Sequence, residues 1–170
     1  DGSKLVTVRG YVPSGSTDIQ RALVEYTLGT TTTPQGTILE VQGERNLAQG
    51  VLSGARMYSP SYGRTGDTVL VSVYEYVNSR DNRDLWEIDL SALASPTRLT
   101  QTQDPVSSNR TAQERHPDYS PDDTKMVYRI YGKPSNRDDG LFVKDTVLSA
   151  TPVQLIASAH VKDPAWRRQP

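Results

Sequence analysis

The residue whose chemistry comes closest to that of a metal ligand or a general base is His116, which follows Glu114 and Arg115 and precedes a Pro-Asp pair. These side chains offer an imidazole, a carboxylate and a guanidinium at the expected entrance of a strand, where they can help to bind a metal or an acid. The alternative, which we favour, is a polar residue at a strand entrance. The other histidine, His160, has less in its surroundings to indicate a site.

Charged side chains gather in two further segments, 78–84 and 135–139. Their carboxylates are the oxygen ligands that Ca²⁺ prefers, but arginines inside each segment oppose a cation, and neither segment has the spacing of an EF-hand loop. We therefore favour solvated turns with local salt bridges. The candidates for contact with a partner are Arg80, Asp81, Asp84, Arg115, His116, Asp118, Arg137, Asp138 and Asp139.

Motifs of common enzyme classes do not occur in the sequence. It contains neither a Gly-x-Ser-x-Gly elbow nor a Walker phosphate loop, a dinucleotide glycine pattern or a His-Glu-x-x-His zinc motif. We predict a protein that is not an enzyme and that carries no cofactor and no metal.

Composition narrows the class of partner. The 19 Lys and Arg residues balance 20 Asp and Glu residues, so no basic face for a nucleic acid is expected. The absence of cysteine excludes disulfides and thiolate ligands. No apolar run approaches the roughly 20 residues of a membrane-spanning helix, so we expect no membrane insertion. The expected partner is a protein.

Short strands are predicted almost everywhere, with a turn or short helix at 44–52 as the exception. Three strands, at 4–11, 69–76 and 125–131, align on their last tyrosines. Residues three and five places before that tyrosine are apolar in each copy, so each strand has one apolar face. The pairs are Val6 with Val8, Val71 with Val73, and Met126 with Tyr128.

Each of these strands belongs to a repeated unit. Polar loops, including 77–84, lead to strands at 22–26, 85–89 and 141–145, and third strands follow at 34–41, 96–100 and 152–156. A further strand carries an aromatic residue, at 57–60, 117–121 and 164–166. Trp86, Phe142, Tyr58, Tyr119 and Trp166 recur in columns that predict packing between units. Four antiparallel strands in about 55 to 65 residues are typical of a β-propeller blade.

The units resemble the TolB-type, WD40-like β-propeller repeat. The resemblance rests on an aromatic-Ser-Pro-Asp turn at 119–122, an apolar strand, a Leu-aromatic-Val-x-Asp strand and a short Pro-x-x-Leu strand. It is closest at 117–155, good at 58–100, where the turn is lengthened at 59–67, and looser at 1–41. It implies an all-β fold of four-stranded antiparallel blades and a periplasmic or extracellular bacterial protein.

About three blades are expected in this single segment of 170 residues. They are about 1–50, which lacks its first strand, about 55–103 and about 115–158, while 163–170 supplies the first strand of the next or the first blade. If 164–166 paired with the strand that starts at Lys4, the first blade would be complete. Since propellers have about four to eight blades, we expect half of a six-bladed propeller, completed by a second copy as a homodimer, or a fragment of one.

The expected function is a scaffold that presents loops or a channel mouth to a protein partner. The alternative is a propeller associated with an enzyme, either the gating domain beside a prolyl-oligopeptidase-like hydrolase or a channel-centred polysaccharide lyase in which His116 binds a metal. Fold analogy is the basis of both readings.

Overall fold

A computed structural model describes residues 3–12, 14–15, 17, 20–77, 80–101, 113–131, 139–158, 160 and 164–166. This part of the chain is all β, as predicted, apart from one short 3₁₀ turn, η1 (Gly50–Leu52). The turn lies inside the segment where a turn or short helix was expected. The strands are β1 (Lys4–Tyr11), β2 (Gln20–Thr33), β3 (Gly36–Asn46), β4 (Arg56–Tyr62), β5 (Thr68–Val77), β6 (Arg80–Asp89), β7 (Thr97–Arg98), β8 (Gln113–Tyr119), β9 (Lys125–Tyr131), β10 (Gly140–Asp145) and β11 (Val153–Ala157).

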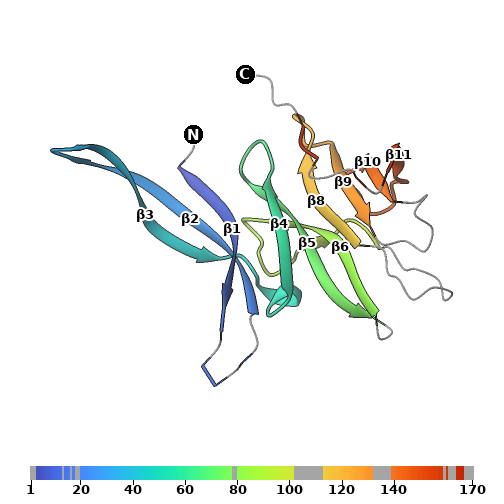
Figure 1. Cartoon of the computed structure of the whole chain (residues 1–170), viewed down its shortest axis with the longest axis horizontal. Helices are drawn as coiled ribbons and strands as arrows, with labels where there is room; N and C mark the ends of the chain where they lie inside the picture. Colours follow the sequence, from blue (N-terminus) through green and yellow to red (C-terminus); the bar gives the residue numbers. More distant parts are fainter. Residues whose placement is uncertain are drawn as a thin grey trace.

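The first unit, β1 to β3, is a three-stranded antiparallel sheet. Because β1 pairs with β2 only as far as Thr27, the rest of the β2–β3 hairpin continues as a two-stranded arm that projects from the body (Figure 1). A run of β-branched threonines at 30–33 favours this extension, and Gly36, at φ 133°, allows the chain to reverse. The third strand therefore runs from Gly36 to Asn46, five residues beyond the predicted end at 41.

The second unit, β4 to β7, and the third unit, β8 to β11, are each a four-stranded antiparallel meander in chain order. They join into one mixed sheet through a single parallel pair between Arg83 and Gln113. The predicted four-stranded unit is thus present twice, and neither sheet closes into a ring within the described residues.

Within the polar segment 77–84, which was predicted to be a loop, residues 77 and 80–84 lie in strands. β5 continues to Val77 and β6 begins at Arg80, so most of this charged run pairs with β5 as strand. Polar residues are tolerated there because Asn82 and Asp84 are buried with polar partners, Asn82 donating to Asp84 at 3.2 Å.

The first strands of the second and third units, β4 and β8, share an unusual backbone feature. Ser59 and His116 both precede a proline and both adopt a positive φ, 50° and 51°, where the register of β4 and of β8 shifts. The turn that follows begins at Tyr62 and at Tyr119. Tyr62, rather than Tyr58, is therefore the counterpart of Tyr119. The turn of the second unit starts at the equivalent residue, so the extra residues that were predicted at its start, after Tyr58, belong to strand β4 instead.

Two apolar cores lie between the units, and β5 contributes to both. Its alternate side chains point to opposite faces, so Val71 and Val73 pack toward the first unit while Leu70 packs toward the third. The predicted apolar faces are confirmed as core. Phe142 and Tyr119 are buried between the second and third units, as predicted, and Trp86 is partly buried against the other core.

The first unit packs on the second differently from the way the third does. Met126 and Tyr128 of the third unit pack against the second unit on the side opposite Val71 and Val73. In the first unit the corresponding face, with Val6 and Val8, is turned toward Val71 and Val73 themselves. The second and third units therefore pack in the same orientation, with opposite faces of their sheets in contact. The first and second units instead contact each other through equivalent faces.

The segment 164–166, which was predicted to be a strand, is not a strand in the structure and does not pair with β1. Trp166 instead donates its backbone N–H to Asp118 Oδ2 at 2.9 Å, next to the third unit. Among the described residues, β1 pairs with β2 alone. The backbone N–H of Trp166 is thus satisfied by a carboxylate rather than by a strand ladder.

Candidate functional site

The first strands of the second and third units, β4 and β8, contact each other and are joined by hydrogen bonds at matching positions. Ser59 Oγ lies 3.1 Å from His116 Nδ1, and Ser61 donates to Asp118 Oδ1 at 2.6 Å. Both pairs are 57 residues apart, so equivalent residues of two repeats contact each other. The predicted residues His116 and Asp118 therefore act in the contact between the second and third units, where their hydrogen bonds join β4 to β8.

Within the described part of the chain, no group of three or more His, Cys, Asp or Glu side chains gathers closely enough to hold a metal ion.

A cluster of arginines and tyrosines lies nearby, at the ends of the strands that face the β5–β6 hairpin. The Cζ atoms of Arg21 and Arg83 lie 4.3 Å and 3.9 Å from the ring centre of Tyr58. Tyr131 is approached in the same way by Arg115 at 5.4 Å and Arg129 at 4.9 Å. We call these six residues the arginine–tyrosine surface; all three units contribute to it.

Arg115, a member of this surface, has a shifted pKa. Burial lowers the pKa of its guanidinium, and the positive charge of Arg129 lowers the same pKa further. The two residues are direct cross-strand partners in β8 and β9. Like charges in that position repel, so the sheet holds two cations together at a cost in stability. Tyr58 and Tyr131 act in the opposite direction on the pKa of Arg115.

The remaining predicted residues divide into three groups. Asp84 is fully buried and forms an ion pair with Arg98, which also bonds Glu75 at 3.0 Å, so its role is structural. Asp139 is buried as well, and its backbone oxygen accepts a hydrogen bond from Gln154 at 3.4 Å.

For Arg80 and Asp81 the structure gives only their backbone pairing in β6, with Val77 and Tyr76. Arg137 and Asp138 lie outside the described residues. Among the predicted candidates whose side chains the structure describes, Arg115 belongs to the arginine–tyrosine surface.

Five members of the arginine–tyrosine surface were not predicted as a site: Arg21, Tyr58, Arg83, Arg129 and Tyr131. A signal was present, because Arg129 and Tyr131 alternate on one strand face and Arg115 stands opposite them. What was missing was the register between units, which brings Tyr58 of β4 next to arginines of β2 and β6.

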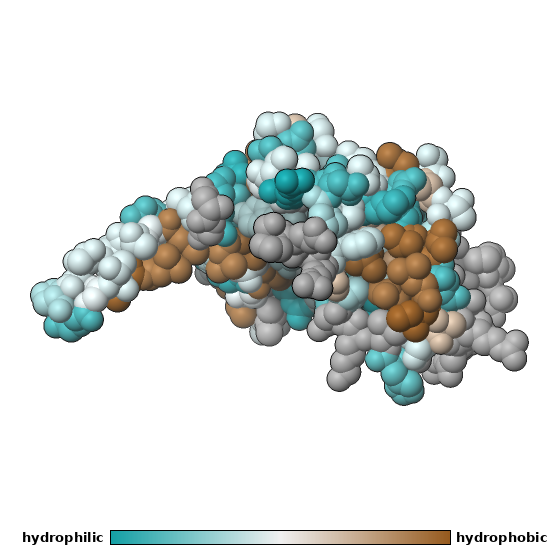
Figure 2. All heavy atoms as spheres, turned by 90° about the horizontal axis from the view of Figure 1, so that it is seen from above, coloured by the Kyte–Doolittle hydropathy of each residue, from teal (hydrophilic) through white to brown (hydrophobic). Residues whose placement is uncertain are grey.

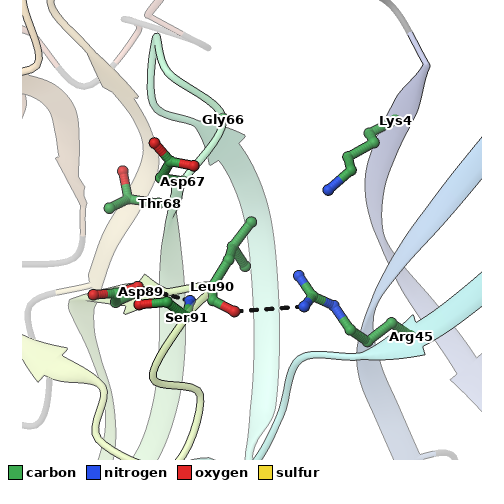
Figure 3. A pocket seen from close by; sticks show the side chains of 8 residues that line it. All are labelled: Lys4, Arg45, Gly66, Asp67, Thr68, Asp89, Leu90 and Ser91. Atoms are coloured by element: carbon green, nitrogen blue, oxygen red, sulfur yellow. Dashed lines mark hydrogen bonds between the residues drawn. The ribbon is translucent and has the colours of Figure 1, made fainter.

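A separate pocket of about 490 Å³ lies between the first and second units (Figure 3). Lys4 and Arg45 point into it from one wall, and the opposite wall consists of residues 66–68 and 89–91. Arg45 donates to the backbone oxygen of Leu90 across the space at 3.4 Å. One wall is cationic and the other contains the carboxylates of Asp67 and Asp89.

A buried carboxylate, Glu25, organises the cationic wall. Its oxygens lie 3.6 Å from Lys4 Nζ and 3.0 Å from Arg45, and Tyr62 of the second unit donates to it at 2.8 Å. Burial and this bond to Glu25 raise the pKa of Tyr62 well above its ordinary value. Both cations are thus already engaged, which makes the pocket a polar junction between two units rather than an open anion site.

No helix in the described part of the chain has the length and apolar character required to cross a membrane. The chain matches no protein-family model and no curated protein sequence.

Proposed function

We propose that the chain is a β-propeller scaffold that binds a protein partner and performs no catalysis. Two observations support the propeller. The second and third units are four-stranded antiparallel meanders of the same strand order, and equivalent residues of their inner strands contact each other, Ser59 with His116 and Ser61 with Asp118. Such contacts between repeats are expected where inner strands line a common axis.

The arginine–tyrosine surface is the proposed docking site, and its convergence from three units is the observation that carries the proposal. Tyrosine and arginine are the residue types most enriched in energetically dominant parts of protein interfaces. Tyr131 is 42% exposed, while Tyr58 and the arginines are half-buried and held against aromatic rings. Partly ordered side chains lose less conformational entropy when a partner binds.

Site-specific photo-crosslinking tests this site. A photoreactive phenylalanine analogue is placed at Tyr131, and a matched control carries it at Thr124, just before the opposite end of the same strand, β9. In cells of the natural host, the proposal predicts a discrete adduct with one protein from position 131 and none from position 124. Equal labelling from both positions would contradict a defined docking site.

The open flanks of the molecule support a second copy as a further partner. Apolar residues are exposed beside and along the edge strand β11 and, at the other end of the molecule, on the first unit and its arm (Figure 2). Exposed apolar surface and an unpaired strand edge favour association. The residues concerned are Val147, Leu148, Val153, Leu155 and Ile156 at one end, and Leu5, Ile38, Leu39 and Val41 at the other.

The proposed homodimer places one flank of each copy against the other, so that two chains build a larger propeller. Light scattering coupled to size exclusion is expected to give a dimer, and Leu155→Lys in β11 is expected to give a monomer. A wild-type monomer at high protein concentration would refute this assembly.

The resemblance to TolB-type repeats places the proposed scaffold in the bacterial periplasm or outside the cell. Fractionation of the natural host tests this location. The enzyme-associated propellers stay alternative predictions, and no contact in the described residues favours them over the scaffold.

A further inference from the structure

The pocket between the first and second units has uncompensated charge on both walls. Glu25 cancels one of the two positive charges that Lys4 and Arg45 contribute, so the cationic wall keeps one. The opposite wall has two negative charges, from Asp67 and Asp89. The pocket lining therefore has one net negative charge, and groups of opposite sign face each other across the space (Figure 3).

Lys4 and Asp67 still have hydrogen-bonding capacity. The Nζ atom of Lys4 lies 3.6 Å from Glu25, which is longer than a hydrogen bond, and 49% of the Lys4 side chain is exposed. The ion pair with Glu25 thus positions the ammonium group but uses none of its three N–H donors. Among the described residues, the Lys4 ammonium donates no hydrogen bond and the Asp67 carboxylate accepts none. Both groups can therefore bind a ligand in the pocket.

A second carboxylate and an apolar side chain complete the lining. Asp89 is the cross-strand partner of Thr68, the residue after Asp67, so the two carboxylates come from adjacent segments. The hydroxyl and the backbone N–H of Ser91 donate to one oxygen of Asp89 and lower the pKa of its carboxyl, which is ionised at neutral pH. The side chain of Leu90 lies between the two walls and offers apolar surface (Figure 3).

We propose that this pocket binds a basic amino acid, a ligand with one carboxylate, two cationic groups and an aliphatic stem. The carboxylate of the ligand accepts hydrogen bonds from Lys4 and Arg45. Its cationic groups face Asp67 and Asp89, and its methylenes cover Leu90.

Charge and size both fit such a ligand. Its one net positive charge balances the net negative charge of the lining, whereas a simple anion would be repelled by the two carboxylates. The volume of about 490 Å³ lies in the range of small-molecule sites, about 300–1,000 Å³. The site does not depend on the proposed docking of a protein partner.

A titration of the ¹⁵N-labelled full chain, followed by NMR, tests the site with three compounds at equal ionic strength. L-Lysine has all the required groups, 1,5-diaminopentane lacks the carboxylate, and L-norleucine lacks the side-chain ammonium. We expect L-lysine to shift the amide signals of 66–68 and 89–91 and to bind at least about fivefold more tightly than either analogue, as one partly exposed ion pair allows. No saturable shift in these residues, or equal affinities for the three compounds, would overturn the site.

Variants on the two walls localise the binding. Asp67→Asn and Lys4→Gln are each expected to weaken the binding of L-lysine about fivefold, and both leave the backbone hydrogen bonds intact. Lys125→Gln is the matched control, because Lys125 begins β9 as Lys4 begins β1 but pairs with Asp145. It should change the affinity less than about twofold.

Equal weakening in Lys4→Gln and Lys125→Gln would mean general charge attraction and would overturn the site. Unchanged affinity in Asp67→Asn would overturn it as well, because this carboxylate is the acceptor proposed for a cationic group of the ligand. No protein partner takes part in the titration, so failure here leaves the crosslinking test of the docking surface unaffected.

Discussion

Leu70 and Val71 are neighbours on β5 and fully buried, yet they belong to different cores. Leu70→Ala removes three carbons from the core between the second and third units. At about 0.8 kcal/mol for each methylene, the transfer loss is about 2 kcal/mol, and the remaining cavity raises the expected loss of unfolding free energy to about 2–5 kcal/mol. Val71→Ala removes two carbons from the other core and is expected to cost about 2 kcal/mol.

The two variants differ more clearly in which strands lose amide protection than in how much unfolding free energy they lose. Native-state hydrogen exchange reports local opening residue by residue. We expect Leu70→Ala to lower protection mainly in β9 and β10, and Val71→Ala to lower it mainly in β1 and β2. Val12→Ala, at an exposed position outside the proposed dimer flanks, is the control and should change stability by about 0.5 kcal/mol or less. The same pattern of protection loss in both core variants would refute the two-core arrangement.

Three further predictions follow from other contacts. Glu25→Gln should lower the free energy of unfolding, measured by chemical denaturation, by about 1–3 kcal/mol. The loss is smaller than for a fully buried ion pair because Lys4 and Arg45 are partly exposed. The control Glu40→Gln, on the arm, should have almost no effect. Since the folded state raises the pKa of Tyr62 above its ordinary value of 10.0, stability should fall as the pH rises above about 10, and Tyr62→Phe should reduce that fall; a tyrosinate absorbance titration in which Tyr62 ionises normally would contradict this. Gly140→Ala should detach β11, because its Cβ would overlap the backbone oxygen of Ile156, and the loss of amide protection at 153–157 should not occur in Gly43→Ala, whose Cβ has room.

The strand content and the buried strand faces were predictable because alternation of apolar residues is a local signal. Val71 with Val73 and Met126 with Tyr128 occupy the core as their spacing indicated. The charged segment 77–84 was misread because polarity alone indicates a turn. Asp84 is polar and buried only because Arg98, on another strand, forms an ion pair with it. Such pairing depends on tertiary register, which composition does not contain.

The candidate site was harder to foresee than the fold. Arg115 could be selected from its place at a strand entrance, but the surface also needs Arg21 and Tyr58 from other units. The alignment of the second unit with the third was misleading, because the serine and proline after Tyr58 resemble the turn at Tyr119. The positive φ shared by Ser59 and His116 reveals the true alignment, and sequence pattern does not encode it.

Hydrogen exchange of the complex with the crosslinked partner tests the central claim of a protein-binding scaffold most directly. Binding at the arginine–tyrosine surface predicts new protection of backbone amides at 56–58, 113–115 and 129–131, with the arm strands at 28–41 unchanged. Protection confined to the arm, or to the pocket residues 66–68 and 89–91, would contradict the account.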